Sequence, residues 1–277
     1  MVGVLLYLLI SGDMLYCGLF GVALGVAAER WRPKLGAGLV WSGLVLALAS
    51  AVPFHSLVYV ILLVCGAGWQ ASRFRSTRVQ KCAATILLVA VTVVFGVGVS
   101  DRGPSGLGLP MDRAVYVLGD SLSAGLGTSK EGTWPQLVSL QLNLSVSNLA
   151  RQGATLATGV LQARAIPEGE ATVLIELGGN DLLGGTTPAQ FAADLHALVL
   201  AVTGTERRVV MFELPLVPFQ NEYGRIQREV SSLYGVALLP RSILAGAVAL
   251  PGHASDGLHL SARGHSWVAM RVGQMWR

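Results

Sequence analysis

The chain has 277 residues, of which 52% are hydrophobic and 13% are charged, about half the charged fraction of an ordinary soluble domain. Residues 1–100 carry seven basic and two acidic side chains, whereas residues 101–277 carry 13 basic and 14 acidic ones. This distribution favours membrane segments in the first hundred residues. It argues against a basic nucleic-acid-binding surface on the second part, so no nucleic-acid partner is expected.

Four apolar stretches occupy the first hundred residues. They cover approximately residues 4–28, 35–52, 54–72 and 82–99, and each is near the roughly 20 residues that a helix needs to cross a bilayer. We therefore predict an all-α transmembrane region of about four helices over residues 1–99. Ser11-Gly12-Asp13 interrupts the first stretch, and a carboxylate is costly at mid-membrane. An alternative is that Asp13 lies near an interface, with a shorter span after it.

Basic residues lie in two of the connections between these stretches. The segments 30–34 and 73–81 should both face the cytoplasm, because positive charge is retained on that side. One crossing, residues 82–99, then separates Lys81 from everything downstream. We therefore expect an integral protein of a bacterial inner (plasma) membrane, with the second part extracytoplasmic. Residues 100–110 are polar and rich in turn formers, which predicts a linker.

From residue 111 onward, short apolar runs alternate with helical patterns. The runs 114–118, 145–150, 172–177, 208–214 and 236–239 are rich in Val, Leu and Ile, which is typical of strands covered on both faces. Helices are expected over residues 134–142, 155–165, 188–202, 218–234 and 262–276. This alternation predicts an α/β domain over residues 111–277, with a parallel sheet between helices. Ligands bind such sheets at the carboxyl ends of the strands.

Polar clusters fall at those strand ends. Gly119-Asp120-Ser121 follows the first run, residues 148–155 follow the second, residues 178–181 follow the third, and Asp256-Gly257-Leu258-His259 precedes the last helix. Alone, each cluster is typical of a turn or a cap. Together they supply the hydroxyl, imidazole, carboxylate and oxyanion donors of a serine hydrolase. Since Asp256 and His259 are three residues apart, the carboxylate is able to reach the imidazole.

The segments GDSLSAG, NLARQGAT, ELGGND and DGLHLSARGH resemble the four blocks of the SGNH (GDSL) hydrolase family. The resemblance covers roughly residues 113–277 and is strongest to the bacterial thioesterase/lysophospholipase branch, which GTWPQLV and FELP also resemble. It implies a flavodoxin-like three-layer sandwich with Ser121 as nucleophile, His259 as base and Asp256 as the group that orients the base. The oxyanion hole would comprise the backbone N–H groups of Ser121 and Gly153 and the amide of Asn180. The membrane region is a departure, because this branch offers no general precedent for it.

The resemblance implies a serine esterase that acts through an acyl-enzyme and requires no cofactor, and the predicted membrane region and basic loops make it membrane-anchored and extracytoplasmic. No metal is expected, because no histidine pair has metal-site spacing with a third ligand. His265 is expected to be structural. The substrate would be an acyl ester, with lipid or fatty-acyl esters and the O-acetyl esters of cell-envelope carbohydrate as alternatives. A third alternative is a membrane sensor or assembly subunit whose hydrolase-like domain reads a ligand.

Overall fold

The computed structural model describes residues 2–100, 106–111, 113–126, 132–204 and 206–276. The chain divides into an α/β unit, formed by Met1–Tyr7, Gly103–Pro215 and Glu222–Arg277, and a helical unit, formed by Leu8–Arg102 and Leu216–Asn221. The sequence instead predicts a membrane region over residues 1–99 and a hydrolase domain over residues 111–277. Half of the predicted linker, residues 101–105, lies outside the described residues. The described part of the linker is bound to the end of α13, because the backbone N–H groups of Leu107 and Leu109 donate to the carbonyls of Met275 and Trp276 at 2.7 and 3.0 Å.

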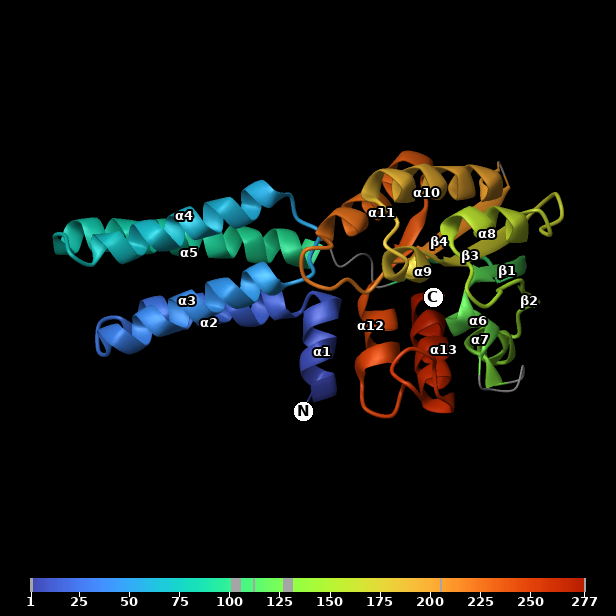
Figure 1. Cartoon of the computed structure of the whole chain (residues 1–277), viewed down its shortest axis with the longest axis horizontal. Coiled ribbons are helices and arrows are strands. Elements are labelled where there is room, and N and C mark those ends of the chain that lie inside the picture. Colours follow the sequence, from blue (N-terminus) through green and yellow to red (C-terminus); the bar gives the residue numbers. More distant parts are fainter. Residues whose placement is uncertain (1, 101–105, 112, 127–131, 205, 277) are drawn as a thin grey trace. The chain divides into compact units, whose positions relative to one another are not determined.

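A parallel five-stranded sheet forms the centre of the α/β unit (Figure 1). Its strands follow the order β2-β1-β3-β4-β5, which is the flavodoxin-like order. The strands are β1 (Ala114–Gly119), β2 (Val146–Asn148), β3 (Ala171–Glu176), β4 (Arg207–Phe212) and β5 (Ala237–Leu239). All five lie where apolar runs predict them. Every residue of β3 is buried, as expected of a central strand covered on both faces.

Helices cover both faces of this sheet (Figure 1). On one side lie α8 (Leu156–Ala163), α10 (Pro188–Val202) and α11 (Asn221–Tyr234), and on the other α7 (Trp134–Leu142), α12 (Ser242–Ala249) and α13 (Ala262–Trp276). The core between β1 and this second layer is built from Val115, Val117, Trp134, Val268 and Val272, all at most 1% exposed. The sequence analysis missed α12, because its run ILAGAVA has no polar residue to reveal a helical period.

Two short helices begin directly after strands of the sheet. α6 (Ser121–Ala124) follows β1, and α9 (Gly179–Leu183) follows β3. The Asp120 carboxylate accepts a hydrogen bond from the backbone N–H of Leu122 at 2.9 Å and so caps α6. Gly178, before α9, has φ 112°, and a Cβ there would lie 2.8 Å from a Leu214 methyl. The chain therefore turns sharply at the end of β3, which only glycine allows without strain.

The helical unit contains α2 (Met14–Ala28), α3 (Pro33–Ala49), α4 (Ser56–Ser72) and α5 (Thr77–Ser100), and α1 (Val2–Ser11) precedes them. Among the described residues, α5 is the one helix that suits a membrane span by its own length and composition, over Thr77–Val99. The pair α1 and α2 would count as a second span, although it is bent by 93°. The prediction of four transmembrane helices is therefore not supported.

The predicted spans differ from the helices for local reasons. The first is broken at Gly12, which adopts φ 89°, and the Asp13 N–H bonds the Ser11 hydroxyl at 3.2 Å. The second and third apolar runs include residues 50–52 and 54–55, which are not helical. The remaining helices α3 and α4 have 17 residues each, below the length that marks a span with certainty by itself.

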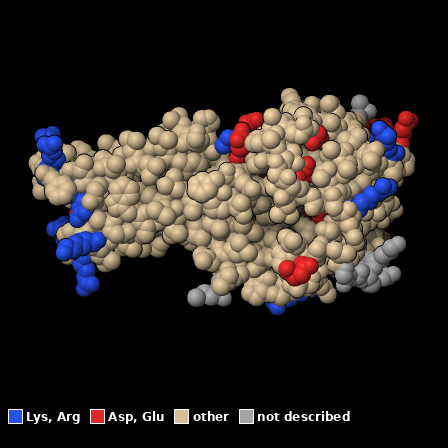
Figure 2. Space-filling model, in the orientation of Figure 1, with Lys and Arg blue, Asp and Glu red and all other residues tan. Residues whose placement is uncertain are grey.

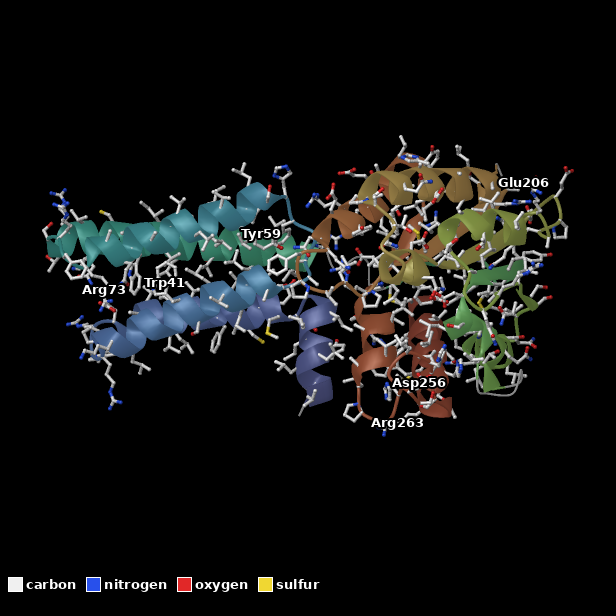
Figure 3. All side chains as sticks on the ribbon, in the orientation of Figure 1. Trp41, Tyr59, Arg73, Glu206, Asp256 and Arg263 are labelled. Carbon is white, nitrogen blue, oxygen red and sulfur yellow. The ribbon has the colours of Figure 1, made fainter. Side chains whose placement is uncertain are left out.

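Glycines bring α2 and α3 into close contact within the helical unit. A Cβ at Gly18 would lie 2.5 Å from the Gly43 carbonyl oxygen, and one at Gly25 would lie 2.7 Å from that of Gly36. Outward-facing side chains of the unit are apolar, and Phe20, for example, is 66% exposed. Apart from Asp13, the charged residues of α2 to α5 and their connections gather at the turns α2–α3 and α4–α5, where Arg73 pairs with Glu29 at 2.7 Å (Figures 2 and 3).

Candidate active site

The residues predicted for the site lie at the carboxyl ends of β1 and β3 and in the loops before α8 and α13. Ser121 is the first residue of α6 and Asn180 the second residue of α9. Gly153 lies in an exposed turn with φ 70°. Asp256 and His259 lie in the loop before α13, and Figure 3 labels Asp256. The topology thus brings segments distant in sequence to one edge of the sheet, as expected for a parallel α/β fold.

Asp256 and His259 form a direct side-chain contact. His259 Nδ1 lies 2.6 Å from Asp256 Oδ2, and Asp256 Oδ1 accepts the backbone N–H groups of Leu258 and His259 at 2.9 and 2.7 Å. The hydrogen bonds from the His259 ring, the His259 N–H and the Leu258 N–H lower the pKa of Asp256. A carboxylate only accepts, so Nδ1 carries the proton and Nε2 is left as the free base.

Asn180 contacts the residue that precedes Ser121. Its Nδ2 donates to the Ala154 carbonyl at 2.9 Å and to Asp120 Oδ2 at 3.2 Å. Both partners are acceptors, which fixes the carboxamide nitrogen on that side, because a flipped oxygen would face two oxygens. The side chain of Asn180 is half-buried. The amide is therefore held beside Ser121 in one orientation.

Not all of the predicted partners are in contact. Within the described residues, the Ser121 hydroxyl has no hydrogen bond, to His259 or to any other group. Burial raises the pKa of Asp120, the residue before Ser121, to about 6, and the charge of His259 is among the groups that oppose this rise. Hydrogen bonds between nucleophile and base are often long without substrate and shorten in the complex.

Other polar side chains brace this edge of the sheet. The Gln162 carboxamide exchanges two 2.9 Å hydrogen bonds with the backbone of Gly119. Asn148 Nδ2 donates to the Ser123 carbonyl at 2.8 Å, and the Asp181 carboxylate accepts the N–H of Leu156 at 3.0 Å. These bonds satisfy backbone groups that strand ends leave unpaired, and so they fix the loops that carry the predicted site.

His265 lies apart from this chemistry. It is 1% exposed, its Nδ1 accepts the backbone N–H of Trp134 at 3.2 Å, and burial lowers its pKa to about 4. A buried, neutral imidazole that receives a backbone N–H fits the structural role that the sequence predicts.

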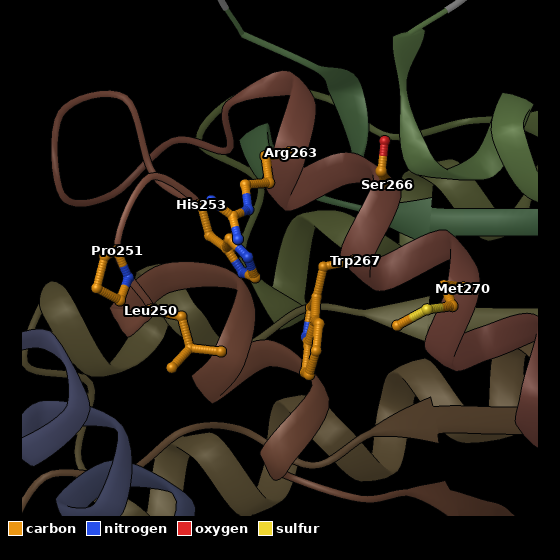
Figure 4. Close-up of a pocket in the computed structure, with 7 residues that line it drawn as sticks. All are labelled: Leu250, Pro251, His253, Arg263, Ser266, Trp267 and Met270. Carbon is orange, nitrogen blue, oxygen red and sulfur yellow. The ribbon is translucent and has the colours of Figure 1, made fainter.

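A cavity of about 530 Å³ lies elsewhere on the α/β unit (Figure 4). It is an open hollow beside α13, lined by Leu250, Pro251, His253, Arg263, Ser266, Trp267 and Met270. None of the predicted site residues lines it. A smaller cavity of about 320 Å³ lies beside α6, where Ala124, Asn148 and Ala150 contribute to its wall.

Comparisons with known proteins agree with the fold and the polar segments. The profile of the GDSL-like Lipase/Acylhydrolase family matches residues 117–267, more than half of the chain. The chain belongs to this family. Because its relatives include esterases, it is a serine esterase.

Several individual proteins are similar to the α/β unit. Esterase TesA of Pseudomonas aeruginosa is 30% identical over 160 residues, which are 53% of this chain and 79% of TesA. The arylesterase of Vibrio mimicus is 29% identical over 173 residues, 58% of this chain and 86% of that enzyme. Thioesterase 1/protease 1/lysophospholipase L1 of Escherichia coli is 30% identical over 135 residues, 46% of this chain and 65% of that protein. The crystal structure of TesA superposes with a TM-score of 0.53 at 29% identity, over 58% of this chain and 96% of TesA.

Proposed function

We propose that the protein hydrolyses acyl esters through an acyl-enzyme formed on Ser121. The Ser121 oxygen attacks the ester carbonyl while His259 Nε2 takes the hydroxyl proton and then returns it to the leaving alcohol. Water then attacks the acyl-enzyme with the help of the same base, which releases the carboxylic acid and restores the Ser121 hydroxyl. The observation that supports these roles is the 2.6 Å bond between His259 Nδ1 and Asp256 Oδ2, because it leaves Nε2 as the base and stabilises the imidazolium.

The oxyanion would be bound by the backbone N–H groups of Ser121 and Gly153 and by the Asn180 amide. Both amide hydrogens of Asn180 already have acceptors, at 2.9 and 3.2 Å. We propose that the hydrogen on the longer bond, to Asp120, is shared with the oxyanion as negative charge develops, while the bonds to Ala154 and Asp120 together hold the amide in place.

The test is covalent labelling with a fluorophosphonate probe, combined with hydrolysis of a small soluble ester. Wild type should be labelled and active, and Ser121→Ala should be neither. Ser123→Ala, two residues away in α6, is the matched control and should still be labelled. If wild type is not labelled although it is folded, the hydrolytic role is wrong, and the sensor or assembly role for the α/β unit becomes the better hypothesis.

For the substrate, we propose lipid or other fatty-acyl esters. The support is the apolar helical unit of the same chain, for which we propose a membrane anchor below, and the similarity to a protein named as a lysophospholipase. O-acetyl esters of cell-envelope carbohydrate are the alternative. A series of p-nitrophenyl esters separates the two, because a lipid enzyme should prefer medium or long chains. Activity confined to acetyl esters or acetylated glycans would exclude the lipid proposal.

We further propose that the helical unit anchors the protein in a membrane. The 23-residue apolar segment Thr77–Val99 is long enough to cross, and the outward-facing side chains of the unit are apolar. Close helix contacts at Gly18 and Gly25 are of the kind that membrane helices favour. The basic turns α2–α3 and α4–α5 would lie in the cytoplasm, which would make the α/β unit extracytoplasmic.

Two measurements test this placement. Carbonate washing of bacterial membranes should leave the full chain in the pellet. Alkaline phosphatase fused after Arg102 should be active, whereas a fusion after Arg78 should be inactive. The reverse fusion pattern would make the α/β unit cytoplasmic, and release by carbonate would exclude an integral protein.

A further inference from the structure

A buried pair of carboxyl groups lies beneath the predicted nucleophile. Asp120 follows β1 and Glu176 ends β3, and they are 4% and 2% exposed. The register of the sheet pairs Gly119 with Glu176, the Asp120 backbone N–H lies 3.4 Å from Glu176 Oε2, and each carboxyl group shifts the pKa of the other. Two ionised carboxylates that are neighbours away from water repel each other. This arrangement favours a pair that holds one proton.

The neighbouring groups indicate which residue keeps the proton. Asp120 is surrounded by donors, since Oδ1 accepts the Leu122 N–H at 2.9 Å and Oδ2 accepts Asn180 Nδ2 at 3.2 Å. Glu176 has only the Ser123 hydroxyl at 2.7 Å and a long contact to the Asp120 N–H at 3.4 Å, both to Oε2. No cation pairs with Glu176 in the described part of the chain. A negative charge on Asp120 therefore receives more hydrogen bonds than a negative charge on Glu176 would.

The electrostatics agree with this distribution. Burial, and then the charge of Asp120, raise the pKa of Glu176 well above its ordinary value. Burial also raises the pKa of Asp120, but only to about 6, because the bonds from Leu122 and Glu176 and the charge of His259 oppose the effects of burial and of nearby Asp181. At neutral pH the pair therefore carries one negative charge, on Asp120.

We propose that Glu176 is a neutral carboxylic acid that donates its proton to the Asp120 carboxylate, and that this pair is the positioning element of Asn180. The proposal rests on the oxyanion role of Asn180 given above. Glu176 does not touch the substrate; it holds the Asp120 carboxylate, which in turn holds the nitrogen side of the Asn180 amide. Glu176 is also hydrogen-bonded to the Ser123 hydroxyl, whose oxygen accepts the Trp134 indole N–H at 3.1 Å.

Glutamine is the matched replacement for a neutral glutamic acid. Its amide oxygen accepts from Ser123 and from the Asp120 backbone, and its NH₂ donates to the Asp120 carboxylate, so every contact of the protonated acid is kept. Alanine removes all of them and leaves a cavity. Glu213 supplies the opposite control: it is also buried, at 6% exposure, but it pairs with Arg228 at 2.7 Å as an anion, so glutamine breaks an ion pair there.

The experiment compares Glu176→Gln, Glu176→Ala and Glu213→Gln in the full chain in detergent. Glu176→Ala should lower kcat about 10–100-fold with KM within about threefold, because a displaced oxyanion donor weakens transition-state binding. Glu176→Gln should restore kcat to within about threefold of wild type. Infrared spectra at neutral pH should contain the carbonyl band of a protonated carboxyl, which Glu176→Gln abolishes and Glu213→Gln retains.

Two results would overturn the proposal: Glu176→Gln as impaired as Glu176→Ala, or a protonated-carboxyl band that is missing in wild type or persists in Glu176→Gln. The infrared result stands even if Glu176→Ala does not fold. It also needs no activity, so it remains informative if fluorophosphonate labelling fails. Failure of labelling would refute the hydrolytic role, whereas failure of the band would refute the neutral Glu176.

Discussion

Replacing Asp256 by asparagine alters one of its three contacts and preserves the others. The asparagine oxygen still accepts the N–H groups of Leu258 and His259, now at 2.9 and 2.7 Å. Its NH₂ then faces His259 Nδ1, where Asp256 Oδ2 lies at 2.6 Å. Two donors cannot share that contact, so the imidazole must move its proton to Nε2, and the base is lost. The loop should keep its shape while the reactive tautomer disappears.

The expected loss in kcat for Asp256→Asn is large, about 10³–10⁴-fold, by analogy with the same change in other triads. KM should change less than about threefold, because substrate contacts remain. Steady-state hydrolysis of a soluble ester measures both, and circular dichroism checks the fold. Asp194→Asn is the control: Asp194 is half-buried, accepts one side-chain hydrogen bond, from Gln190 at 2.9 Å, and should retain full activity. A folded Asp256→Asn within tenfold of wild type would refute the tautomer argument.

The other predictions address the remaining groups of the site. Ser121→Ala and His259→Ala should each lower kcat by several orders of magnitude, and the double variant should lose little more, since triad members act as a unit; additive losses would contradict this. Asn180→Ala should lose about 10²–10³ in kcat with KM nearly unchanged, and a defect confined to KM would exclude an oxyanion role. His265→Gln should keep its rate within a few-fold, and loss of activity in a folded protein would mean that the base is misassigned. Because burial lowers the pKa of His265 to about 4, the unfolded chain takes up its proton first as pH falls. Wild type should therefore lose stability between about pH 6.5 and pH 4, and thermal melts of His265→Gln should be less sensitive to pH over that range.

The strands and most helices of the α/β unit were predictable because each has a local signal. Buried strands such as β3 appear as short runs of Val, Leu and Ile, and Thr187-Pro188 marks the start of α10, where the Thr187 hydroxyl accepts the Gln190 N–H at 3.3 Å. The number of membrane spans was not predictable in this way. Hydropathy counts apolar residues whether or not they are helical, so residues 50–52 and 54–55, which are not helical, were included in the expected spans.

The site was predictable only in part, for a related reason. Asp256 and His259 are close in sequence, so their spacing alone suggests a contact. Glu176 was missed, although an acid at the end of the mostly apolar run ATVLIE was a usable signal. Its partner Asp120 lies 56 residues earlier, and only the pairing of β1 with β3 brings the two together. Long-range contacts of this kind depend on strand order, which the sequence does not determine.

Strand order also arranges the charges around His259. The Asp256 carboxylate contacts the ring at 2.6 Å, and the Asp120 carboxylate acts on it across the site. In the proposed mechanism, both would favour the imidazolium that forms when Ser121 attacks. A third ionised carboxyl, at Glu176, would oppose the oxyanion, because all of this charge would lie beneath one edge of the sheet. Keeping Glu176 neutral retains its hydrogen bond to Asp120 without adding that charge. The infrared band of Glu176 and the kcat of Glu176→Gln should therefore report on the same feature of the site.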